Sequence, residues 1–94
     1  MALARVVMFD GVGADRMEQV KGEIEGGERP EGLPATEIVV LHDPGAERAI
    51  VVFFFESEDD YARGDAVMNA MPAGDTPGKR TSVTRYDVVV RRAV

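Results

Sequence analysis

Residues 49–56 form the most apolar stretch of the chain and predict a β-strand that is buried on both faces. Side chains along a strand point alternately to opposite sides, and here both alternating sets are apolar. Residues 4–10 show the same property, because the neighbours Val6 and Val7 point to opposite sides and both are aliphatic. Both segments are therefore expected to be central strands of a sheet.

Two other stretches have the helical period, in which apolar residues recur every three or four positions. The first begins at residue 15 and ends near the glycine pair Gly26 and Gly27. The second follows Ser57, a residue type that caps helices, and its first turn is acidic, as the helix dipole favours. Pro72 marks the end of this second helix.

Two further strands are predicted, at residues 36–42 and at residues 81–91. The Asp-Pro-Gly-Ala sequence at residues 43–46 is typical of a type II turn, in which Gly45 supplies the positive φ of the third position. The strand at 36–42 is therefore expected to form an antiparallel hairpin with the strand at 49–56. The last strand is polar mainly on one side, which indicates an edge strand.

The predicted order of elements is β-α-β-β-α-β, and the expected fold is α+β and ferredoxin-like. This fold has one antiparallel four-stranded sheet, in spatial order 4-1-3-2, with both helices on one face. Residues 1–94 are expected to form a single domain, given their number. Two helices cover only one face of such a sheet. The apolar second face is expected to be covered by a second copy of the chain, which predicts a homodimer.

Composition narrows the possible partners of the chain. Hydrophobic residues make up 45% and charged residues 30%, an ordinary balance for a globular protein. The net charge of −6 argues against a nucleic-acid partner, because such proteins need clustered positive charge. It therefore also argues against an RNA-recognition domain, which has the same element order and stacks bases on sheet aromatics. The apolar N-terminal run is too short to span a membrane, so a cytoplasmic protein without membrane contact is expected.

The predicted pattern resembles the dimeric α+β barrel superfamily. The resemblance covers the whole chain and depends on the doubly apolar sheet and the long last strand, which includes residues 80–90. It implies that two sheets pack face to face as a barrel around a cavity. Members of the superfamily include small monooxygenases of antibiotic biosynthesis, haem-degrading enzymes and isomerases. The chain contains no single motif that selects one of these activities.

His42 is the candidate catalytic residue, because it is the one histidine of the chain and has the intrinsic pKa of a general base. The alternative is a histidine at a strand end without a catalytic role. The residues that the haem-degrading members use have no counterpart here, since the chain lacks Trp and its one Asn, Asn69, lies on the second predicted helix. No cofactor is therefore expected. No metal site is expected either, because one imidazole and no Cys match the common zinc ligand sets poorly.

The candidate ligand-binding residues at the barrel cavity are His42, Arg85, Tyr86 and Asp87. The alternative for the last three is a role as surface residues of an edge strand. The first functional hypothesis is a homodimeric protein that binds a small apolar or aromatic molecule in the barrel cavity. The second is a cofactor-independent monooxygenase or isomerase that acts on a phenolic or quinol substrate. A purely structural or interaction module is the third.

Overall fold

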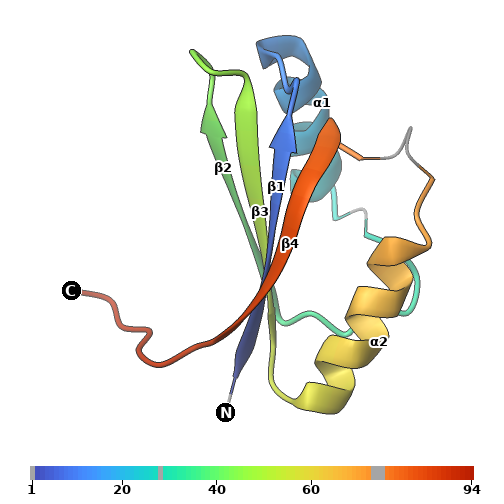
Figure 1. Cartoon of the computed structure of the whole chain (residues 1–94), viewed down its shortest axis with the longest axis vertical. Helices are drawn as coiled ribbons and strands as arrows, with labels where there is room; N and C mark the ends of the chain where they lie inside the picture. The colour runs from blue at the N-terminus through green and yellow to red at the C-terminus, as the bar shows by residue number, and fades with distance from the viewer. Residues whose placement is uncertain (1, 28, 73–75) are drawn as a thin grey trace.

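The computed structural model describes residues 2–27, 29–72 and 76–94. Within these ranges the chain forms an α+β fold whose elements follow the predicted order (Figure 1). The elements are β1 (Leu3–Asp10), α1 (Ala14–Glu25), β2 (Glu37–Asp43), β3 (Arg48–Phe55), α2 (Glu58–Asn69) and β4 (Lys79–Asp87). None of the helices in the described ranges has the length and apolar character needed to cross a membrane.

The sheet has the predicted topology. Its four strands lie in the order β2-β3-β1-β4, and all three neighbouring pairs are antiparallel. The two strands that are apolar on both faces, β1 and β3, occupy the centre, as predicted. In their register Val6 lies opposite Val52, and Val52 lies opposite Val39 of β2. The arrangement is consistent with a ferredoxin-like fold.

One face of the sheet, called here the helix face, carries the core. Side chains from α1 and α2 pack against it, and both helices lie on that side of the sheet (Figure 1). The N-terminus of α2 is capped as predicted, because the Ser57 hydroxyl oxygen accepts the N–H of Asp60 at 3.1 Å. The buried residues of the helix face on the two central strands are Leu3, Arg5, Val7, Phe9, Ala49, Val51, Phe53 and Phe55.

The opposite face, called here the open face, has no layer formed by the described residues packed over most of it. Most of its apolar side chains on the central strands are half-buried, and Leu41 on β2 is 53% exposed. The apolar residues of the open face on β1, β2 and β3 are Ala4, Val6, Met8, Val39, Leu41, Ile50, Val52 and Phe54.

The predicted hairpin between β2 and β3 is confirmed, but the predicted type II turn is wrong. Gly45 does not have a positive φ, and the left-handed residue is Glu47, with φ of 51°. The Asp43 carboxylate accepts the N–H of Ala46 at 3.2 Å, and the N–H of Glu47 donates to the carbonyl of Pro44 at 3.3 Å. This side-chain acceptor holds the turn in a form that the Pro-Gly pair alone does not indicate.

The last strand is shorter than predicted. It ends at Asp87, and Val88 makes one more hydrogen bond, from its N–H to the carbonyl of Ala2 at 2.9 Å. The following residues run from β4 toward the β2 side of the sheet (Figure 1). There the Arg91 guanidinium pairs with the Glu37 carboxylate and lies 4.1 Å from the centre of the Phe54 ring. The C-terminal segment therefore covers only one end of the open face.

Candidate functional site

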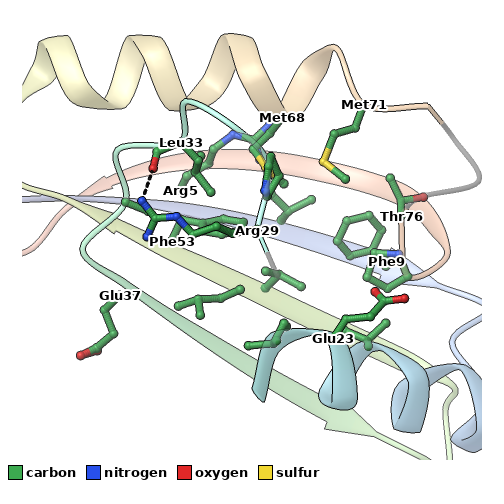
Figure 2. Close-up of a pocket in the computed structure, with 18 of the residues that line it drawn as sticks. Arg5, Phe9, Glu23, Arg29, Leu33, Glu37, Phe53, Met68, Met71 and Thr76 are labelled. Atoms are coloured by element: carbon green, nitrogen blue, oxygen red, sulfur yellow. Dashed lines mark hydrogen bonds between the residues drawn. The ribbon is translucent and has the colours of Figure 1, made fainter. Parts of the chain in front are cut away.

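A cleft of about 690 Å³ lies on the helix face, between α1 and α2 (Figure 2). Its floor is apolar and comes from the central strands, with Val7 and Phe9 from β1 and Val51 and Phe53 from β3. This volume falls within the range of about 300–1,000 Å³ that is usual for small-molecule sites. We call this site the interhelical cleft.

The walls of the interhelical cleft come from the two helices and from the segments that follow them. Met68 of α2 and Met71 just beyond it line one side, and Glu23 of α1 lines the other (Figure 2). Thioether side chains adapt to ligands of different shape, because they are flexible and polarisable. The nearby Glu37 side chain points away from the other labelled residues (Figure 2), and its carboxylate is paired with Arg91.

Arg5 is the most deeply buried charged residue of the described chain, with 1% of its surface exposed. It lies on the helix face of β1 and lines the cleft. Its Nε donates to the Asp65 carboxylate at 2.8 Å, and its Nη2 donates to the Asn69 side-chain oxygen at 3.1 Å, both on α2. A buried charge requires such partners, since an isolated one would be very costly.

Arg80, at the start of β4, is aimed into the cleft by an irregularity in the sheet. Met8 lies opposite Ser82, whereas the next residue of β1, Phe9, lies opposite Arg80, so Thr81 is an extra residue in β4. Strict alternation along β4 would place Arg80 on the open face. This β-bulge places it on the helix face instead, and bulges often have this effect next to functional sites.

Two more arginines line the cleft, and both donate to neutral oxygens. Arg16 of α1 donates to the carbonyl of Thr76 at 3.0 Å and to the side-chain oxygen of Gln19 at 3.2 Å. Arg29 donates to the carbonyl of Leu33 at 2.9 Å, which closes the loop between α1 and β2 on itself (Figure 2). The cleft therefore combines an apolar floor with a cationic rim.

Tyr61 lies near the start of α2, where its ring contacts the Phe55 ring edge to face, with 5.5 Å between the ring centroids. Burial raises the pKa of the Tyr61 hydroxyl, and the negative charge of Asp65 raises it further. The guanidinium groups of Arg5 and Arg85 act on this pKa in the opposite direction. Tyr61 is thus a neutral core residue next to the Arg5–Asp65 pair.

His42 lies near the C-terminal end of β2, whereas the residues of β2 that line the cleft, Glu37 and Ile38, lie at its N-terminal end. Its Nε2 lies 2.9 Å from the carbonyl oxygen of Val12, and because a carbonyl can only accept, Nε2 must carry the proton. His42 lines a smaller hollow of about 370 Å³ beside α1, which adjoins the interhelical cleft and shares Val20, Ile24 and Ile38 with it. The described residues include no group of three or more His, Asp or Glu side chains arranged to hold a metal ion.

The other three sequence candidates lie on β4, at the opposite edge of the sheet from His42. Arg85 faces α2, where it pairs with the Glu58 carboxylate at 2.8 Å and lies 5.3 Å from the centre of the Tyr61 ring. Asp87 lies opposite Leu3 on the same face, whereas Tyr86 is on the open face and 55% exposed. Within one chain these four candidates do not form a common site.

None of the four candidate residues predicted from the sequence lines the interhelical cleft. The position of Arg5 in the sequence could have indicated its importance, because a charged residue inside a strand that is apolar on both faces must be either paired or functional. The sequence does not indicate that Arg80 faces the cleft, since its orientation depends on the bulge at Thr81. Comparison of the chain with protein-family models, curated proteins and solved structures finds no match.

Proposed function

We propose that this protein binds a small apolar or aromatic molecule in the interhelical cleft. The observation that carries the proposal is the cleft itself, with an apolar floor and a few polar groups converging on it from several elements. This combination is typical of ligand sites in proteins. The proposal moves the ligand from the barrel interior, expected from the sequence, to the opposite face of the sheet.

We further propose that the protein works as a homodimer in which two open faces pack together, as in a dimeric α+β barrel. The apolar side chains of the open face support this, because soluble monomers rarely leave large contiguous apolar patches in water. Val89 and Val90, which follow β4 beside this face, are 83% and 80% exposed. A second copy related by a two-fold axis would present the same apolar surface and cover these residues.

The alternative of a monooxygenase or isomerase gains no support from the site. A general base must reach the proton that it removes. His42 lines the adjoining smaller hollow and is not among the residues that line the interhelical cleft, and its Nε2 is engaged by the Val12 carbonyl. We therefore give binding as the function of the cleft and assign no reaction to it.

The test is binding of a neutral apolar fluorophore, N-phenylnaphthylamine, whose emission rises when it leaves water. We expect saturable binding to the wild-type protein. Ala35→Trp should weaken it strongly, because a large side chain at this cleft-lining position occupies part of the cavity.

Leu41→Asp is the matched control, because it alters the open face and leaves the cleft intact. Circular dichroism establishes that both variants are folded. Loss of binding in Leu41→Asp with full binding in Ala35→Trp would place the ligand on the open face and overturn the proposal.

A further inference from the structure

We propose that the ligand of the interhelical cleft is an anion: a small apolar or aromatic molecule with a carboxylate or phosphate group that is bound by Arg5 and Arg80. This inference rests on the proposed binding function of the cleft and adds the chemical class of its ligand. The observation that supports it is that the guanidinium groups of Arg5 and Arg80 donate to the same side-chain oxygen.

One neutral oxygen holds the two arginines next to each other. The side-chain oxygen of Asn69 accepts from Nη2 of Arg5 at 3.1 Å and from Nη1 of Arg80 at 2.8 Å. Two guanidinium groups that share one acceptor lie close together, and their positive charges repel each other. The repulsion is stronger at a partly dry site than in water. Among the described residues, one carboxylate pairs with this arginine pair: Asp65 accepts from Nε of Arg5. The pair therefore retains a net positive charge.

The charge of the cleft contrasts with that of the chain. Net charge is −6 for the whole chain, yet four arginines line the cleft: Arg5, Arg16, Arg29 and Arg80. Of these, only Arg5 is paired with a carboxylate of a described residue. The planar guanidinium fork matches carboxylate and phosphate oxygens, so the rim is suited to an anionic head group.

The β-bulge gives a second, independent argument. Without the extra residue Thr81, the side chain of Arg80 would lie on the open face. A bulge interrupts the ladder of hydrogen bonds, and here it brings a second cation beside a buried one. A purely structural role for the network needs only Arg5, Asp65 and Asn69. Arg80 adds charge to that network and is itself exposed, which a ligand-binding role explains.

Glu23 sets the orientation of the ligand. Its carboxylate is on the α1 side of the cleft, across from Met71 (Figure 2). An anionic head group is repelled by this carboxylate and attracted by Arg5 and Arg80. The head group therefore binds at the β1–β4 side, and the apolar part of the ligand lies over Phe53 and Val51.

The experiment compares three naphthalene compounds that differ only in their polar group: naphthol, naphthoate and naphthyl phosphate. The affinity of each is measured by its displacement of N-phenylnaphthylamine from the wild-type protein at neutral pH. We expect at least one of the two anions to bind about tenfold more tightly than naphthol, equivalent to about 1.4 kcal/mol. The order of naphthoate and naphthyl phosphate then identifies the head group as carboxylate or phosphate.

Arg80→Gln should remove this preference, so that the affinity for the anion falls relative to the affinity for naphthol. Arg48→Gln is the matched control, because it makes the same change in net charge at an exposed arginine that pairs with Asp10 outside the cleft. Glu23→Gln should tighten anion binding. If Arg80→Gln does not fold, Arg5→Met replaces it.

The failures of the two proposals are distinguishable. Displacement of the fluorophore by all three compounds with equal affinity would overturn the anion inference and leave the binding function standing. Equal weakening by Arg80→Gln and Arg48→Gln would also overturn it, because the effect would then come from net charge alone. Absence of fluorophore binding to the wild-type protein would overturn the binding function itself.

Discussion

Arg5 shows how one residue joins the core to the candidate site. It lies in the middle of the helix face with 1% of its surface exposed, and its two partners both come from α2. Its position could be predicted in part, because alternation along β1 puts Arg5 on the same side as Val7. Its partners could not, since Asp65 and Asn69 are distant in sequence and reach it only once α2 has packed.

The Arg5–Asp65 pair gives a prediction about stability. Asp65→Ala should lower the free energy of unfolding by about 2–3 kcal/mol, because it leaves a buried guanidinium without its carboxylate. This is less than for a fully buried pair, since the Asp65 side chain is 36% exposed. Arg5→Met should cost less than Asp65→Ala, because it leaves no buried charge. Urea denaturation of both variants measures the difference, and a larger loss in Arg5→Met would contradict this account.

At the scale of the elements, the fold followed from local patterns. The two-residue and helical periods of the apolar positions indicated the strands and helices, and the doubly apolar strands indicated which two are central. The failures came from interactions that these patterns do not contain. The Asp43 side chain sets the turn before β3, and the register against β1 creates the bulge in β4. The orientation of Arg80 depends on that register and therefore could not be predicted from the sequence.

Close packing of α2 on β3 gives a prediction for two helical glycines. A methyl group at Gly64 would overlap the Phe55 ring, whereas one at Gly22 of α1 would meet no other atom. Gly64→Ala should therefore destabilise the protein by about 1–3 kcal/mol through overpacking, despite the better helix propensity of alanine.

The matched variant Gly22→Ala should stabilise the protein by up to about 1 kcal/mol, because only the propensity changes. Thermal unfolding followed by circular dichroism measures both. Shifts of the same sign in the two variants would show that α2 does not approach β3 as closely as described.

For the whole molecule, the open face is the surface on which the proposed homodimer depends. The sheet has one face covered by helices and one face of apolar side chains. Within the described part of the chain, this second face is covered at the end where Arg91 lies over Phe54. This imbalance could be predicted from the two strands that are apolar on both sides. The location of the interhelical cleft could not, because it depends on the distance between two helices that each pack on the sheet.

The proposed homodimer is tested at Val52, the centre of the open face. Light scattering at micromolar concentration should give the wild-type protein twice the 10.2 kDa mass of the chain. Val52→Asp should give the mass of one chain with the β-sheet signal retained, because a carboxylate at this position prevents burial by a partner and does not enter the core.

Ala62→Asp, at an exposed position of α2, is the charge-matched control and should keep the mass of two chains. A wild-type protein that stays at the mass of one chain at all concentrations would contradict the proposed assembly.

The alternation of side chains along β3 has a consequence for how the protein tolerates mutation. Val51 and Phe53 line the cleft, while Val52 and Phe54 belong to the open face. Substitutions at successive positions should therefore alternate between defects in ligand affinity and defects in self-association. A one-residue insertion or deletion within this strand is different in kind. It turns every later side chain to the other face, so a single such change should disrupt both the proposed ligand binding and the proposed self-association.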